Sequence, residues 1–213
     1  MYHYFDRIIC PDAEAPILEG QYNRGYVFTR IRKGGMDKVR SVRVALDTWS
    51  MTSENRRLMR KTEGLALTAV TLPLRDYSWK IAKLAKDFYR TRNATFSANR
   101  VKEILVGQNN FNTLLVYSHN ESVVGYTACF ETPRVLHYAY PFYVEDSSLG
   151  RDCGMGMMLR AIAYAKESHK QYVYLGSLSR SPDSYKLQFK NIEWFDGTQW
   201  QTDRDAAKAL VRL

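Results

Sequence analysis

A chain of 213 residues, 45% hydrophobic and 25% charged, has the composition of a folded protein with a sizeable core, which excludes an intrinsically disordered chain. The 31 Lys and Arg residues outnumber the 22 Asp and Glu residues, and the formal net charge of +9 favours a polyanionic partner such as a nucleic acid. No apolar run approaches the roughly 20 residues of a membrane span, and no signal peptide is recognisable, so we expect a cytoplasmic protein without a membrane partner. The three cysteines lack C-x-x-C spacing, which indicates neither a disulfide framework nor a metal site.

The first strand pattern lies in residues 40–49, where Val42, Val44 and Leu46 alternate with polar residues such as Arg43. This alternation predicts a half-buried strand whose charged side chains point to the solvent side.

A helix is predicted next, within residues 50–65, capped by Thr52 or Ser53 and ended near Gly64. Its basic residues fall along one face, and they are Arg56, Arg57, Arg60 and Lys61. This face is either an ordinary solvated surface or a contact for phosphate groups. Residues 67–76 are interpreted as a connection.

The middle of the chain predicts two helices followed by three strands. Apolar residues recur at helical spacing over residues 77–93, and a shorter helix is closed by Gly107. Three β-branched and aromatic runs, separated by polar turns, then predict antiparallel neighbours over residues 112–119, 122–133 and 134–146.

A glycine-containing stretch, "RDCGMG", precedes the next predicted helix and holds Arg151, Gly154 and Gly156. Glycines in such a loop let backbone N–H groups approach a phosphate at the positive end of a helix, and we expect neither glycine to lie in the core. A tight turn before a helix is the alternative. Beyond this helix the sequence predicts a buried strand at 171–177 and one or two strands around an Asp-Gly turn. A short terminal helix ends the chain.

This order of elements, with its R-x-x-G-x-G pattern, resembles the GCN5-related acyltransferase (GNAT) superfamily. The resemblance implies an α/β (α+β) fold in which a mixed, mainly antiparallel sheet is flanked by helices, with a small N-terminal extension. We expect residues 1–72 to form a strand and basic-helix module packed on a GNAT-like core of residues 73–213, unless one continuous domain spans residues 1–213.

A more specific resemblance runs through the C-terminal half. Its segments are similar to the R-S-L-G, L-R-x-I-x-x-A-K, Y-V-Y-L-G-Y, M-x-Y-K-x-x-F and D-G-x-W motifs of the aminoacyl-tRNA–protein transferases, which are the arginyltransferases and the bacterial leucyltransferases. The matching residues are Arg151, Gly154, Leu159, Arg160, Ile162, Ala165, Lys166, Tyr172, Val173, Tyr174, Leu175, Gly176, Tyr185, Lys186, Phe189, Asp196, Gly197 and Trp200. The stretch "VRVALDTWSMTSENRRLMRKTEGL" resembles an N-terminal motif of the same family, and it places Ser53 and the four basic helix residues on matching positions.

The resemblance implies that the protein transfers an amino acid from aminoacyl-tRNA, as co-substrate, to an amine of a protein or peptide, with no other cofactor. It implies that Tyr185 and Lys186 contact the ribose and phosphate of the tRNA acceptor end. Tyr174 is the next candidate for this contact, provided that its strand presents the side chain to a cleft and does not pack it in the core. The donor's phosphates would contact Ser53 and the basic helix, the glycine loop with Arg151, and Lys190. If the basic helix is only a solvated face, we expect the tRNA to dock around Lys186 and Lys190 instead.

Such a transfer is the aminolysis of an ester, in which positioning and oxyanion stabilisation dominate. In a GNAT-like fold we expect backbone N–H groups of residues 141–144 to face the carbonyl. Glu145 or Asp146 would attract the attacking ammonium or take its proton, although each is otherwise an exposed turn carboxylate.

Two departures from the family leave alternatives open. Only Cys10 stands where members have N-terminal cysteines that can bind a metal or iron–sulfur centre, so we expect that site to be absent. Gly156 restores the acetyltransferase-like pattern, so an acetyl-CoA-dependent N-acetyltransferase is the second hypothesis and a non-catalytic RNA-binding relative the third. The residues do not choose between arginine and leucine.

Overall fold

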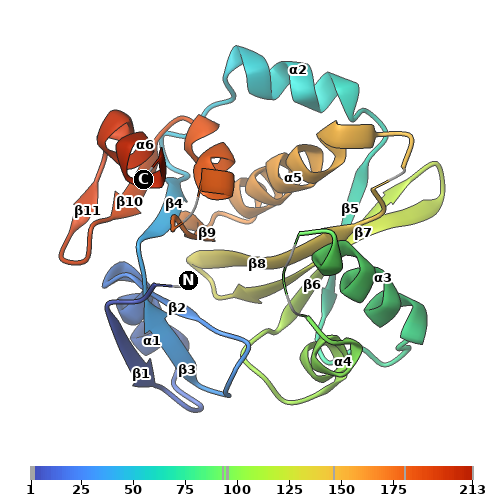
Figure 1. Ribbon diagram of the computed structural model, residues 1–213, viewed down its shortest axis with the longest axis horizontal. Helices are drawn as coiled ribbons and strands as arrows, with labels where there is room; N and C mark the ends of the chain where they lie inside the picture. Colours follow the sequence, from blue (N-terminus) through green and yellow to red (C-terminus); the bar gives the residue numbers. More distant parts are fainter. Residues whose placement is uncertain (1–2, 93, 95, 146, 180, 213) are drawn as a thin grey trace.

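The protein is described by a computed structural model over residues 3–92, 94, 96–145, 147–179 and 181–212 (Figure 1). Its strands are β1 (Asp6–Ile9), β2 (Tyr26–Phe28), β3 (Gly35–Lys38), β4 (Ser41–Ala45), β5 (Ala66–Thr71), β6 (Thr113–His119), β7 (Ser122–Glu131), β8 (Val135–Tyr143), β9 (Tyr172–Ser177), β10 (Ile192–Phe195) and β11 (Trp200–Gln201). Its helices are α1 (Ala15–Asn23), α2 (Ser53–Lys61), α3 (Trp79–Arg90), α4 (Ala98–Val106), α5 (Cys153–Glu167) and α6 (Arg204–Arg212), with 3₁₀ helices η1 (Gly150–Asp152) and η2 (Ser181–Gln188).

One large sheet organises the molecule. Its eight strands lie in the order β11-β10-β4-β9-β8-β7-β6-β5, and β1, β3 and β2 form a separate small sheet. Every neighbouring pair is antiparallel except β8 and β9, which are parallel and joined through α5. The predicted fold class, a mixed but mainly antiparallel sheet flanked by helices, is confirmed.

Helices and the small sheet cover both faces of the large sheet, so its apolar residues fall into two clusters. One cluster packs α2, α5 and α6 on the sheet, with Leu58, Leu159 and Val211 among its members. The other packs α1, α3, α4 and the small sheet on the opposite face. A central strand is therefore buried on both sides, as is usual for a sheet between two layers.

Local signals in the sequence set several element boundaries. Thr52 caps α2 by accepting from the N–H of Asn55, whose side chain accepts in return from the Thr52 N–H. Gly107 follows the last residue of α4, as predicted. The predicted antiparallel meander is confirmed as β6, β7 and β8, and the C-terminal strands and helix as β10, β11 and α6.

Other expectations are wrong. Part of the connection over residues 67–76 forms β5, an edge strand of the large sheet, and residues 6–38, for which no element was predicted, form three strands and α1. The strand over residues 41–45 is not half-buried: β9 and β10 flank it, residues 41–44 are buried, and Arg43 is only 6% exposed.

The large sheet joins both parts of the chain, because β4 and β5, which precede residue 73, pair with strands that follow it.

None of the helices that the structure describes combines the length and the apolar character needed to cross a membrane.

Candidate functional site

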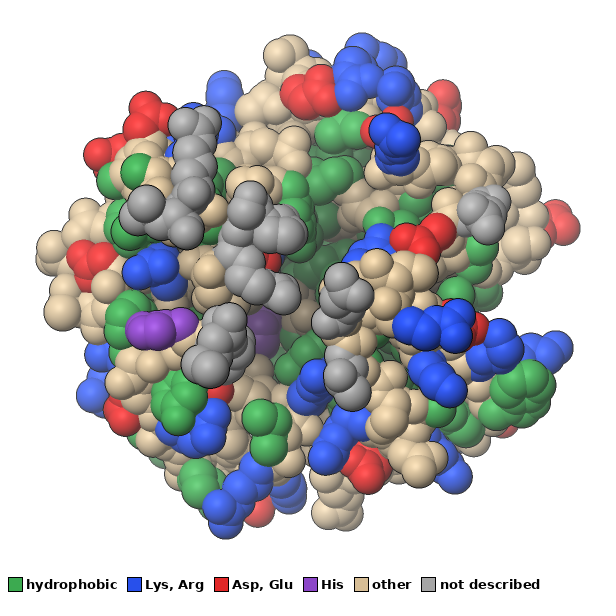
Figure 2. Space-filling model, viewed as in Figure 1, with side chains coloured by type: hydrophobic (Ala, Val, Ile, Leu, Met, Phe, Trp, Pro, Cys, Tyr) green, Lys and Arg blue, Asp and Glu red, His purple; other side chains and the backbone are tan. Residues whose placement is uncertain are grey.

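β8 and β9 separate toward their carboxyl ends. They pair only from Val135 to His137 on β8, after which β8 stays paired with β7 as far as Tyr143 while β9 pairs with β4. Within the described residues, no strand pairs with this edge of β8 beyond His137. Figure 2 shows this side of the molecule hollowed near its centre, with hydrophobic side chains deep inside, where β8, α3 and α5 meet in Figure 1. We refer to this feature as the central hollow.

The unpaired edge of β8 offers fewer backbone donors than expected. The N–H of Val144 bonds the carbonyl of Val124 at 2.8 Å, and because directions alternate along a strand, Phe142 also points its N–H at β7. Pro141 has no N–H. Of residues 141–144, only Tyr143 directs its N–H to the unpaired edge.

Three tyrosines from different elements lie close together at this edge of β8. Tyr89 of α3 donates to the carbonyl of Pro141 at 2.9 Å, and Tyr138 lies on β8 itself. Tyr185 of η2 is 39% exposed. Burial raises the pKa of Tyr89 and of Tyr138, and the nearby Tyr185 hydroxyl adds a smaller contribution to both. Sequence reasoning selected only Tyr185, because the other two lie in runs that read as apolar packing.

Lys186 is held inside the protein, next to Tyr185. Its ammonium is buried, donates to the Ser177 carbonyl at 2.6 Å and pairs with Asp183 at 3.2 Å. The η2 segment therefore presents the tyrosine outward and holds the lysine at the carboxyl end of β9. Lys190 lies just beyond η2 and is exposed.

Gly154 and Gly156 lie within α5 and not in a loop before it. A Cβ at Gly154 would come within 2.8 Å of the Tyr143 hydroxyl, and one at Gly156 within 2.7 Å of the Thr62 side chain. The expectation that neither glycine lies in the core is wrong for Gly156, which is buried. The glycines admit two protein side chains, whereas the exposed Arg151 lies in η1, directly before α5.

Arg160 of α5 fastens the end of α2 to α5. Its guanidinium donates to the carbonyl of Thr62 at 2.6 Å, to the Thr62 hydroxyl at 3.0 Å and to the carbonyl of Leu65. Lys61 adds an ion pair to Asp152 at 3.2 Å. These contacts bring the cationic helix α2 beside the amino end of α5, at the top of Figure 1.

The basic residues of α2 differ in how they are held. Arg57 pairs with Glu54 one turn earlier, and Arg56 donates to the Met51 carbonyl at 2.8 Å. Arg60 and Ser53 are exposed. The predicted helix is confirmed, and its charges lie at the surface.

Glu145 forms an ion pair with Arg92 at 2.8 Å, and both side chains are partly exposed. Arg92 also lies 3.6 Å from the centre of the Phe88 ring and donates to the Tyr143 hydroxyl at 3.4 Å. Arg92, which sequence reasoning missed, thus connects the end of α3 to the end of β8. Asp146 lies outside the described residues.

Tyr174 does not face a cleft. Its ring is completely buried, and its hydroxyl accepts from Arg43 at 3.0 Å. Burial raises the pKa of Tyr174 to about 12, with Arg43 opposing the rise. Arg43 itself is sandwiched between the rings of Tyr172 and Trp200 at 3.9 and 3.8 Å and pairs with Glu193 at 2.6 Å. This part of the family resemblance therefore maps onto a buried structural network.

His137 stands at the last position where β8 and β9 pair. Its Nδ1 lies 2.9 Å from the Tyr22 hydroxyl, and burial, assisted by Lys186, lowers its pKa to about 3. The imidazole is therefore neutral at physiological pH. Among the described residues, no group of three or more His, Cys, Asp or Glu side chains is placed to hold a metal ion.

The antiparallel meander, the α5 crossover and the splayed β8–β9 pair define a GNAT-like fold. The C-terminal domain (DUF2156) of a protein described as a lysylphosphatidylglycerol synthetase, from Agrobacterium fabrum, has a similar structure, with a TM-score of 0.50 and 13% identity over 76% of this chain and 51% of that one. A GCN5-related glucosamine N-acetyltransferase region of a fungal β-N-acetylglucosaminidase aligns with a TM-score of 0.44 and 13% identity over 78% of this chain and 20% of that one.

Residues 80–196 match the family described as arginine-tRNA-protein transferase, C terminus. The match covers more than half of the chain, and the protein belongs to this family. An aspartate/glutamate leucyltransferase of Ruegeria pomeroyi is 35% identical over 104 residues. That alignment takes in 46% of this chain and only 37% of the relative, so the chain matches little more than a third of its length.

Proposed function

We propose that the protein transfers an amino acid from aminoacyl-tRNA to an amine of a protein or peptide. The observation that carries this proposal is the extent of the family match, because residues 80–196 include α3, β8, α5, β9 and η2. These are the elements around the central hollow. The relative's name favours leucine as the transferred residue and an acidic acceptor, whereas the family description favours arginine.

Aminolysis of the tRNA ester requires that a neutral amine attack the carbonyl and that the ribose oxygen leave. We assign the Tyr143 N–H, at the unpaired edge of β8, to the developing oxyanion. Glu145, held by Arg92, would attract the acceptor ammonium and take the proton that it loses to become the attacking amine. After attack, a second proton of that nitrogen would pass to the ribose oxygen as its bond to the carbonyl carbon breaks. Tyr185 reaches the surface close to two buried tyrosine hydroxyls and is assigned to the acceptor-end ribose.

The glycines of α5 argue against acetyl-CoA as donor. In the acetyl-CoA hypothesis, Gly154 and Gly156 would leave room for the pyrophosphate of the donor. The space beside Gly154 is already filled by Tyr143, and the space beside Gly156 by Thr62. The same contacts do not affect RNA docking on the exposed side of α2.

Incubation of the protein with total tRNA, charged with one labelled amino acid at a time, and a mixture of peptides with acidic or neutral N-termini should label a peptide with one amino acid only. Acetyl-CoA should not compete, because it would share no site with the donor. Acetyl transfer from acetyl-CoA without any RNA affinity would instead support the acetyltransferase hypothesis. RNA binding without transfer to any acceptor would support a non-catalytic relative.

Charge reversal on α2 should weaken tRNA binding. In the double variant Arg56→Glu, Arg60→Glu, the slope of log affinity against log salt should fall by about two, since each lost phosphate contact removes about one unit. Fluorescence anisotropy of labelled tRNA over a salt series measures this slope. Peptide affinity should hardly change, and an unchanged slope would mean that α2 is only a solvated surface.

A further inference from the structure

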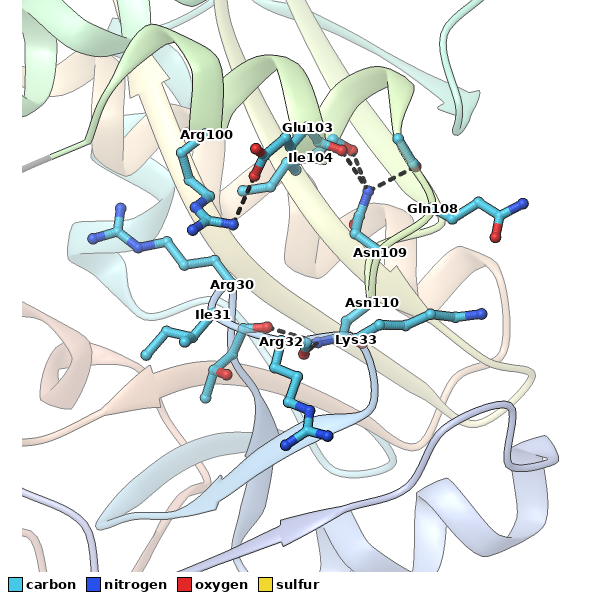
Figure 3. Close-up of a pocket in the computed structure, with 12 residues that line it drawn as sticks. Arg30, Ile31, Arg32, Lys33, Arg100, Glu103, Ile104, Gln108, Asn109 and Asn110 are labelled. Atoms are coloured by element: carbon cyan, nitrogen blue, oxygen red, sulfur yellow. Dashed lines mark hydrogen bonds and ion pairs between the residues drawn. The ribbon is translucent and has the colours of Figure 1, made fainter.

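A second cationic surface lies on the other side of the central hollow from α2. The turn between β2 and β3 and the carboxyl end of α4 enclose a groove of about 290 Å³ (Figure 3). Its charged lining comprises Arg30, Arg32, Lys33, Arg100 and one carboxylate, Glu103. In Figure 1, α2 lies at the top, and α4 and the β2–β3 turn lie at the bottom. We call this feature the basic groove.

The cationic turn is held in one conformation from beneath. The buried Asn110 donates to the carbonyls of Thr29 and Arg32 at 2.7 and 2.8 Å and accepts from the N–H of Gly34 at 2.6 Å. Gly34 has a φ of +73°, and a Cβ there would come within 2.6 Å of the Pro11 backbone. A fixed turn presents its side chains without a large ordering cost on binding.

The charges of the groove remain available to an anionic ligand. Lys33 pairs with Asp12 and Arg100 with Glu103, but all four side chains are well exposed, and such surface pairs are weak and exchangeable. The carboxyl end of α4 would repel an anion, yet the Asn109 amide donates to the carbonyls of Glu103 and Ile104 in the helix and of Gly107 directly after it. The groove is therefore cationic on balance.

Arg30 connects the groove to β8. The Arg30 guanidinium lies 4.2 Å from the centre of the Phe96 ring, and the backbone N–H of Arg30 donates to the Tyr140 hydroxyl at 3.1 Å. Tyr140 lies on the part of β8 beyond its pairing with β9. A nucleic-acid strand bound in the groove could therefore continue along β8 toward the central hollow.

We propose that the basic groove binds the sugar-phosphate backbone of the RNA donor near its aminoacylated end. This inference rests on the proposed function. Four cations from two elements, the β2–β3 turn and α4, line the groove, which fits a polyanion with several phosphates better than the single carboxylate of an acidic acceptor. Ile31, 65% exposed beside them, offers an apolar surface to a ribose or base.

The test is tRNA binding by the double variant Arg32→Gln, Lys33→Gln, measured by fluorescence anisotropy of deacylated tRNA over a potassium chloride series. Both side chains are exposed, so the fold should persist. We expect an affinity loss on the order of tenfold at low salt and a salt slope lower by about two. The matched control, Arg134→Gln with Lys208→Gln, removes the same charge outside the groove and should keep the wild-type slope.

The outcomes separate this proposal from the proposed function. An unchanged salt slope in the groove variant overturns the groove assignment, even if the wild-type protein transfers amino acids normally. A raised KM for an acidic peptide, with tRNA affinity unchanged, also overturns it and places the acceptor in the groove. A reduced slope in a protein that transfers nothing supports the groove and contradicts the proposed function. Wild-type protein that binds no tRNA contradicts both.

Discussion

Arg43→Ala should lower the free energy of unfolding by about 3 kcal/mol, because it leaves a buried cluster without its cation. The guanidinium donates to Glu193, Asn23 and the Tyr174 hydroxyl, and it fills the space between two aromatic rings. Since β4 lies between β9 and β10, the loss should loosen the contact between the C-terminal strands and the rest of the sheet. Urea unfolding followed by far-UV circular dichroism measures the change.

Arg134→Ala is the control for this experiment. Arg134 is exposed and its side chain bonds Gln171, so its removal should change stability by no more than about 0.5 kcal/mol. Equal effects at Arg134 and Arg43 would show that the buried network contributes no more than a surface arginine.

Gly156→Ala should destabilise the protein by about 2 kcal/mol, although alanine is the better helix former. The added Cβ would meet Thr62 at 2.7 Å, and Thr62 cannot easily turn aside because its hydroxyl donates to the Leu58 carbonyl and accepts from Arg160. The strain would separate α2 from α5, so tRNA affinity should fall together with the melting temperature.

Gly20→Ala provides the matched comparison, because Gly20 also lies within a helix but a Cβ there would meet nothing within 4 Å. This variant should be up to about 1 kcal/mol more stable than the wild type, which is the ordinary gain of helix propensity. If Gly156→Ala were stabilised to the same degree, the contact between α2 and α5 would tolerate an extra methyl group. The close approach of Thr62 would then not explain why position 156 is a glycine.

The candidate site was predictable from the sequence only in part. The family motif directed attention to η2 and α5. A motif does not show, however, that Tyr185 points outward while Lys186 points inward and pairs with Asp183. Tyr89 and Arg92 carry no motif, and they reach the end of β8 only because α3 packs on that strand.

The sequence by itself determined the elements whose signals are local. The cap of α2 joins residues three positions apart, α4 ends just before its glycine, and the meander follows from β-branched and aromatic runs with polar turns between them. Only the tertiary structure decided what depends on distant partners. Arg43 alternates like a solvent-facing residue, yet it is buried because Glu193, 150 positions away, lies beside it on β10. Gly156 reads as part of a phosphate loop, yet it faces Thr62 at the end of α2. Burial and close approach are set by which elements pack together, and no local pattern contains that information.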